Sequence, residues 1–146
     1  MTSTSVRRLT GAVGQVVLGV MLLVAGAAHL TVAREEFRAQ VPSWLPLDAE
    51  LVVVASGVVE ICLGLALLAA WRQPVRGLTG AVVAAFFVAV FPGNIAQFAE
   101  GRDGFGLDTD AARAVRLLFQ PLLVLWALAA TDAVPALRSL RRRPES

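Results

Sequence analysis

The sequence contains no lysine and no tyrosine, one cysteine and one histidine. The lone Cys62 excludes a disulfide within the chain and any Cys-x-x-Cys redox or zinc motif. Because one histidine and scattered carboxylates do not make a ligand set, we expect no metal site. All 13 basic residues are arginines, and the net charge of +2 is too small to indicate a nucleic-acid partner.

Charge of either sign is scarce. Only 16% of the 146 residues are charged and 57% are hydrophobic, whereas soluble domains average about 25% and about 45–50%. The length suits one small domain. The composition therefore indicates a membrane protein.

Four long apolar runs predict an all-α, multi-pass protein built as an antiparallel bundle of four transmembrane helices. We expect the spans at about residues 11–30, 51–71, 77–98 and 112–134. A helix of about 20 residues crosses a hydrocarbon layer of about 30 Å at a rise of about 1.5 Å per residue. Residues 1–10 then form an N-terminal segment and residues 135–146 an arginine-rich tail.

The arginines predict the orientation of the bundle. The N-terminus, the second connection and the tail carry Arg7, Arg8, Arg72, Arg76, Arg138, Arg141, Arg142 and Arg143, whereas the other two connections carry Arg34, Arg38, Arg102, Arg113 and Arg116. The positive-inside rule therefore predicts that both termini are cytoplasmic. A cleaved secretory signal is the alternative for the first span, but its apolar run is longer than a usual signal core.

Small residues predict how the helices pack, because close backbone approach drives helix association in lipid. Gly19 and Gly26 are seven residues apart on the first span, and so are Gly57 and Gly64 on the second. On the third span small residues recur every four positions, at Gly77, Ala81, Ala85 and Ala89. These spacings predict a compact bundle.

Glu60 is the most unusual residue of the spans. It lies nine residues after Leu51, near the centre of the bilayer, where a charged side chain costs at least about 2.5–3.5 kcal/mol. It must face the bundle and be paired, hydrogen-bonded or neutral. We interpret it as a functional residue; the alternative is a neutral acid that makes one structural hydrogen bond.

Other polar residues fall at one end of their spans in the predicted topology: His29, Asn94, Gln97, Arg116 and Gln120. Each has a structural alternative. The histidine can cap a helix, the amides can satisfy carbonyls freed by Pro92, and the arginine can reach the membrane surface. Together they predict a polar pocket open to the extracytoplasmic side, with Glu60 as its floor and Trp44 as a lid.

Five motifs carry a family resemblance: residues 26–30 (GAAHL), 41–46 (VPSWLP), 56–61 (SGVVEI), 90–94 (VFPGN) and 116–122 (RLLFQPL). In this order and spacing they resemble the DoxX-like family of small bacterial four-helix membrane proteins. Gly93 departs from the family, in which we expect alanine. The resemblance implies an inner-membrane protein connected with redox metabolism, alongside thiosulfate:quinone oxidoreductase subunits.

Three functions are compatible with the sequence. The first is a non-enzymatic accessory or anchor of a membrane redox or stress system, with soluble redox enzymes as partners. The second is an oxidoreductase subunit that binds a quinone or another small amphiphile; the chain builds no cofactor site, so a quinone would be bound from outside. The third is a small proton-coupled transporter, which would require a homo-oligomer.

Overall fold

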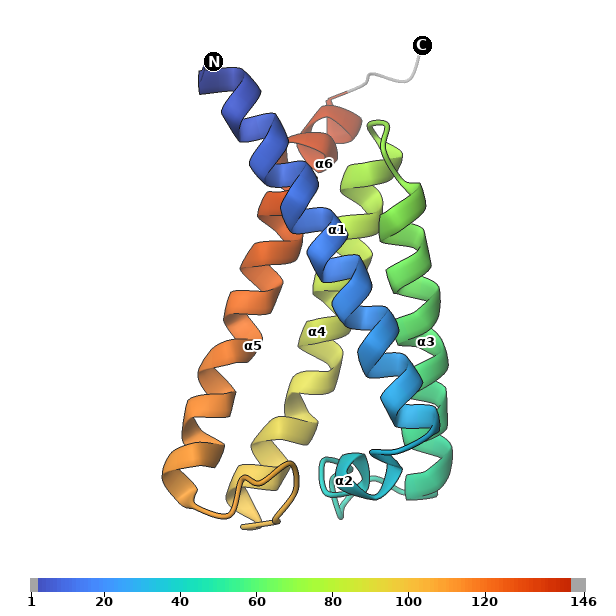
Figure 1. Ribbon diagram of the computed structural model, residues 1–146, viewed down its shortest axis with the longest axis vertical. Helices are drawn as coiled ribbons and strands as arrows, with labels where there is room; N and C mark the ends of the chain where they lie inside the picture. Colours follow the sequence, from blue (N-terminus) through green and yellow to red (C-terminus); the bar gives the residue numbers. More distant parts are fainter. Residues whose placement is uncertain (1–2, 143–146) are drawn as a thin grey trace.

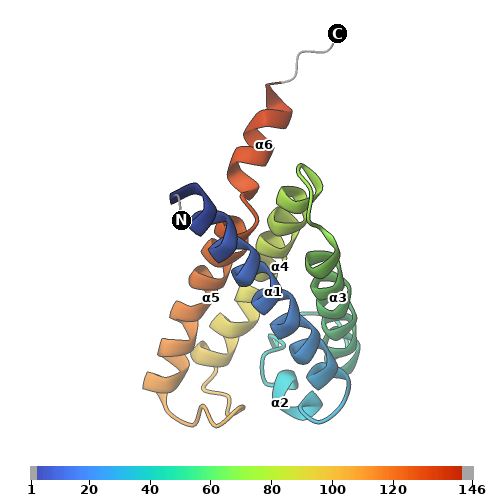
Figure 2. The same cartoon turned by 45° about the horizontal axis from the view of Figure 1, so that its top comes forward.

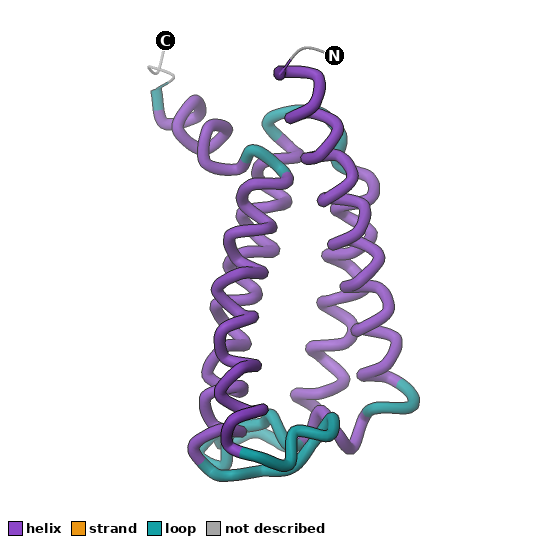
Figure 3. The backbone as a smooth tube through the Cα atoms, turned by 60° about the vertical axis from the view of Figure 1, so that its left-hand side comes forward, coloured by secondary structure: helices purple, strands orange, loops and turns teal. Residues whose placement is uncertain are grey.

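The computed structural model describes residues 3–142 of the chain and is helical throughout, with no strand in that range. The helices are α1 (Ser3–Leu30), α2 (Arg34–Arg38), α3 (Ala49–Ala69), α4 (Val75–Ala99), α5 (Asp110–Ala130) and α6 (Ala133–Arg141). The four long helices stand side by side, and the start of α1 lies at the same end as α6 (Figures 1 and 2). Most loop residues gather at the other end, which we call the α2 end (Figure 3).

Four helices are long and apolar enough to cross a membrane: Ser5–Leu30, Ala49–Ala69, Val75–Ala99 and Asp110–Ala130. Much of their apolar surface faces outward, as at Val24, Leu118 and Leu125, which are all more than 60% exposed. An apolar exterior on helices of this length suits lipid rather than water. The expected all-α chain with four helices able to span a membrane is confirmed.

Local capping moves the helix starts away from the expected bounds. Asp48 accepts a hydrogen bond from the Leu51 backbone, so α3 begins at Ala49, and Thr109 does the same for α5 through Ala112. The N-terminal segment is also helical, because α1 already begins at Ser3. Residues 1–2 lie outside the described range.

The fourth span is shorter than the sequence predicts. We expect it to reach residue 134, but α5 ends at Ala130 and Asp132 takes a left-handed conformation, with φ 53°. A new helix, α6, begins at Ala133 and packs against α4. The expected tail is therefore a short helix up to Arg141, while Arg143 of that tail lies outside the described residues.

The glycines of the first two spans bring α1 and α3 into close contact. A Cβ atom at Gly26 would lie 2.6 Å from the Gly57 carbonyl oxygen, and one at Gly64 would lie 2.7 Å from that of Gly19. Only glycine permits backbones this close. The α1–α3 pair is accordingly the most extensive helix contact, followed by α4–α5.

The predicted stripe on α4 is wrong in part. Ala85 and Ala89 are exposed, although Gly77 is buried. The packed face instead continues through Gly80, where a Cβ would overlap Thr131. The reason is that a strict four-residue spacing drifts around a helix of about 3.6 residues per turn. The stripe therefore begins under α6 at Gly77 but leaves the packed face by Ala85.

Candidate functional site

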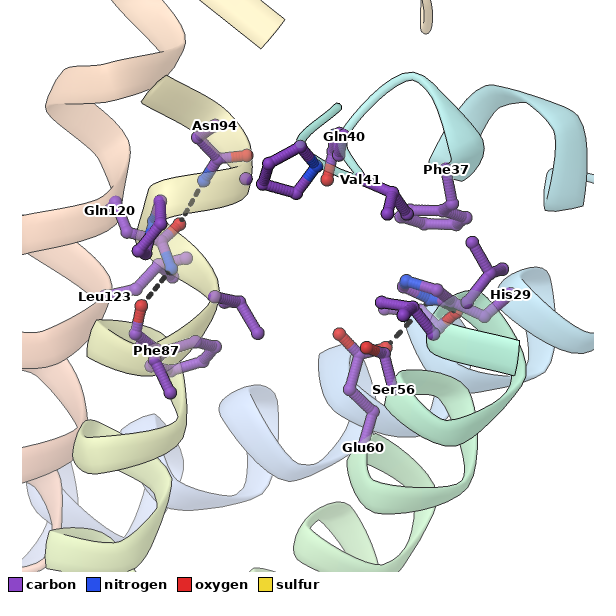
Figure 4. Close-up of a pocket in the computed structure, with 18 of the residues that line it drawn as sticks. His29, Phe37, Gln40, Val41, Ser56, Glu60, Phe87, Asn94, Gln120 and Leu123 are labelled. Carbon is purple, nitrogen blue, oxygen red and sulfur yellow. Dashed lines mark hydrogen bonds and ion pairs between the residues drawn. The ribbon is translucent and has the colours of Figure 1, made fainter. Parts of the chain in front are cut away.

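A cavity of about 560 Å³ lies between the α1–α3 pair and the α4–α5 pair, toward the α2 end. All four long helices contribute to its lining, together with α2, residues 40–45 and Phe105. Such a volume is typical of small-molecule sites. Figure 4 shows two polar walls that face each other across it, one from α1 and α3 and the other from α4 and α5.

The first wall contains His29 and Glu60. Their Nδ1 and Oε2 atoms are 3.0 Å apart, and the side chains are only 9% and 12% exposed. Nδ1 also lies 2.9 Å from the Ala25 carbonyl oxygen. Because both neighbours are acceptors when Glu60 is ionised, Nδ1 carries the proton. The N–H is aligned with Ala25, so Oε2 of Glu60 has no hydrogen bond among the described residues.

The glycine contact between α1 and α3 creates this pair. Gly57 lies three residues before Glu60, and a Cβ atom there would meet the His29 Cβ at 2.7 Å. The missing side chain thus lets the end of α1 lie directly against α3. Ser56, one turn before Glu60, lines the cavity beside the pair.

The opposite wall is a chain of hydrogen bonds. Arg116 Nε donates to Asn94 Oδ1 (3.3 Å), Asn94 Nδ2 donates to Gln120 Oε1 (3.0 Å), and Gln120 Nε2 donates to the Phe87 carbonyl (2.6 Å). Pro92 has no N–H for the carbonyl one turn back. The carbonyl left without a helical donor is that of Val88, and Gln120 donates to the adjacent carbonyl, that of Phe87. The side-chain amides of Asn94 and Gln120 therefore also stabilise α4 near Pro92.

The part of the cavity farther from the loops is apolar. It is lined by Leu18 and Leu22 of α1, Phe87 of α4 and Leu123 of α5. Leu18, Leu22 and Phe87 belong to the buried core of the bundle. One cavity thus combines a polar region with an apolar region, which is the chemistry that an amphiphile requires.

Aromatic rings close the cavity at the α2 end. The Phe37 ring stacks on the His29 ring, with centroids 3.2 Å apart, and Phe105 meets Phe37 edge-on at 4.6 Å. The Arg116 guanidinium lies 5.5 Å from the Phe105 ring centre, within the range of a cation–π contact. This aromatic roof joins the two polar walls.

Hydrogen bonds hold the loops of the roof together. Ser43 donates to Glu100 (3.0 Å), Arg102 donates to the Val41 carbonyl (2.6 Å), and Arg102 also pairs with Glu100. Trp44, beside this contact, is 66% exposed and lines the cavity at its rim. The expected lid residue is therefore next to a polar clamp formed by Ser43, Glu100 and Arg102.

The clamp is expected to open in acid. Hydrogen bonds from Ser43, chiefly from its hydroxyl, hold the pKa of Glu100 below its ordinary value of 4.5. Folding lowers this pKa, so ionised Glu100 stabilises the clamp. This stabilisation is complete above pH 4.5 and is lost as the pH falls through the lower pKa of the folded state. Acid titration should change the tryptophan fluorescence, to which Trp44 contributes, in wild type but not in Glu100→Gln, and Glu35→Gln is the control. An identical transition in Glu100→Gln would contradict this account.

The structure brings most of the expected site residues together. His29, Trp44, Glu60, Asn94, Arg116 and Gln120 all line the cavity. Gln97 does not; it is buried one turn beyond Asn94, where residues 101–104 cover it, and its amide donates to the Arg102 carbonyl (3.4 Å). It shares a helix face with Asn94, but the loop separates it from the cavity.

Sequence reasoning missed Gln40, Phe37, Phe105 and Ser56, which also line the cavity. Helical spacing from Glu60 could have found Ser56. The other three come from loops or the short α2, where no periodicity indicates a direction. No group of three potential metal-ligating side chains occurs within residues 3–142.

Comparison with known proteins gives one match. Residues 18–131 match the family model described as "Domain of unknown function (DUF8561)", which covers all four long helices in whole or in part. No curated protein and no solved structure matches the chain. On the strength of this match over most of its length, the chain belongs to the DUF8561 family.

Proposed function

We propose that this chain is an antiparallel four-helix protein of the bacterial inner membrane with both termini in the cytoplasm. The arginine count supports this orientation. The end that carries α6 has Arg7, Arg8, Arg72, Arg76, Arg138, Arg141 and Arg142, whereas the α2 end has Arg34, Arg38, Arg102, Arg113 and Arg116. The positive-inside rule favours the cytoplasmic side for the end with more arginines.

The function that the site supports best is binding of a quinone-like amphiphile in the cavity. The further proposal, that the chain is an accessory component of a membrane redox system, rests on the resemblance of its motifs to the DoxX-like family. The observation that carries the binding proposal is the cavity itself, with a His–Glu pair at its polar end and core side chains at its apolar end. In the proposed orientation the polar end faces away from the cytoplasm.

The residues have defined roles in this proposal. His29 and Glu60 exchange protons with the head group of the ligand, because their paired atoms lie side by side in a largely dry wall. Asn94 and Gln120 hold Arg116 in position on the opposite wall. Electrons would come from a soluble redox enzyme docked on the membrane protein, since no described cluster of side chains could carry them.

Glu60→Gln is the direct test. The substitution keeps the shape of the side chain but removes its charge, and hydrogen bonds to charged groups contribute about 1.5–3 kcal/mol. We therefore expect binding of decylubiquinol to the purified protein to weaken by about tenfold or more, measured by isothermal titration calorimetry.

Glu50→Gln is the matched control, because Glu50 pairs with Arg34 outside the cavity. Equal affinities in wild type and Glu60→Gln would contradict the role of Glu60. Failure of the wild-type protein to bind decylubiquinol or decylubiquinone, or to copurify with quinone from its own membranes, would contradict the proposed function.

A further inference from the structure

The cavity contains hydrogen-bond donors that the protein does not use. The side-chain nitrogen of Gln40 is buried and has no acceptor among the described residues. Arg116 donates through Nε to Asn94, but neither Nη atom has an acceptor in the described part of the chain, and no carboxylate pairs with its charge there. Both side chains line the cavity.

The backbone of Gln40 is held beside the wall that contains Arg116. The Gln40 backbone rests on α4 at Gly93, where a Cβ atom would lie 2.5 Å from the Gln40 carbonyl oxygen. Gly93 immediately precedes Asn94, which accepts the hydrogen bond from Arg116. The glycine at position 93 is thus what admits Gln40 to this wall, and Figure 4 shows Gln40 to the right of Asn94 at the top of the cavity.

The facing wall has the opposite character. Oε2 of Glu60 is a buried acceptor without an aligned donor, although His29 is beside it. Buried polar groups in folded proteins are nearly always hydrogen-bonded, so unsatisfied groups around one cavity indicate that something else completes them. Here the unused donors are gathered on one wall and the unused acceptor is on the other.

From this arrangement we infer that Gln40 and Arg116 form a subsite for an acceptor oxygen, separate from the His29–Glu60 pair. The inference rests on the proposed function and specifies its ligand: an amphiphile whose head group presents a carbonyl or anionic oxygen to Gln40 and Arg116. A second, proton-bearing or proton-accepting group of the same head faces His29 and Glu60. A ring with oxygens on opposite sides fits this description.

The subsite is held ready for a ligand. Phe105 contacts one face of the Arg116 guanidinium, and Asn94 fixes its Nε. Gln120 in turn fixes Asn94. Little side-chain freedom remains to be lost on binding, which favours affinity. Gln40 is held through its backbone at Gly93.

The test compares two probes that share an acceptor oxygen. Decylubiquinone offers oxygens on both sides of its ring, whereas dodecanoate offers a single carboxylate. Binding of each to the full-length protein in detergent micelles is measured by isothermal titration calorimetry for wild type, Gln40→Leu, Arg116→Gln and Glu60→Gln. Arg72→Gln, an exposed arginine at the other end of the bundle, is the control, and thermal melting identifies variants that fail to fold.

We expect Gln40→Leu and Arg116→Gln each to weaken decylubiquinone binding by about tenfold or more, with Arg72→Gln unchanged. Unchanged affinity in both folded variants would overturn the subsite while leaving the proposed function in place. Dodecanoate binding that depends on Arg116 but not on Glu60, with no binding of decylubiquinone, would overturn the two-sided head group. If the wild type binds neither probe and does not bind decylubiquinol, the proposed function fails together with the subsite.

Discussion

Gly57→Ala is expected to separate His29 from Glu60 and to abolish ligand binding at the cavity. The added Cβ would lie 2.7 Å from the His29 Cβ and 3.0 Å from the Gly26 carbonyl oxygen, so α1 must move away from α3. Overpacking of this kind costs about 1–3 kcal/mol. The movement occurs where the His29–Glu60 pair forms. Ligand binding should therefore be lost even though the free energy of unfolding falls only by this amount.

Gly64→Ala is the matched comparison. It introduces a clash on the same pair of helices, with its Cβ 2.7 Å from the Gly19 carbonyl oxygen, but it lies two turns along α3 from Gly57 and does not contact His29. Unfolding in sodium dodecyl sulfate should show similar destabilisation of both variants, while calorimetry should show lost decylubiquinone binding only for Gly57→Ala. Equal binding by the two variants would show that the glycine contact does not position His29.

The spacing of small residues identifies the packed face on α3 but only in part on α4. On α1 and α3 the glycines face each other because no other element intervenes, and a seven-residue repeat identifies the contact. On α4 the four-residue spacing finds the packed face only at its start, where Gly77 lies under α6, and misses Gly80, which lies against Thr131. The break between α5 and α6 depends on the left-handed conformation at Asp132, which the apolar pattern of the preceding span does not indicate.

The polar residues of the site could be selected from the sequence because lipid makes them costly. Which of these residues reach the cavity depends on where the loops lie. Gln97 shares a helix face with Asn94 but is covered by residues 101–104, whereas Gln40 reaches the cavity from a connection. Such residues have no periodicity, and their places follow from contacts such as that of Gln40 with Gly93, which join segments far apart in the chain.

The end of the bundle opposite the cavity has a polar cluster, formed by Gln15 and Arg76, whose buried hydrogen bonds are satisfied by other groups of the chain. Gln15 is fully buried, and its side-chain nitrogen donates to the carbonyls of Leu67 (2.6 Å) and Ala70 (2.8 Å). Arg76 donates to Gln15 Oε1 (2.6 Å) and to the Ala130 carbonyl (2.6 Å). One arginine and one glutamine thus join α1, α3, α4 and the end of α5, where helix carbonyls lack partners of their own.

Arg76→Leu is therefore expected to destabilise the bundle by about 3–5 kcal/mol, since it removes two charge-assisted hydrogen bonds and leaves the Gln15 oxygen buried without a donor. Arg72→Leu, an exposed change in the same turn, should have little effect. Unfolding in sodium dodecyl sulfate, followed by circular dichroism, measures both. Because the cluster is remote from the cavity, the folded fraction of Arg76→Leu should still bind decylubiquinone, in contrast to Gly57→Ala. Equal stability of the two arginine variants would mean that the cluster does not hold the helices together.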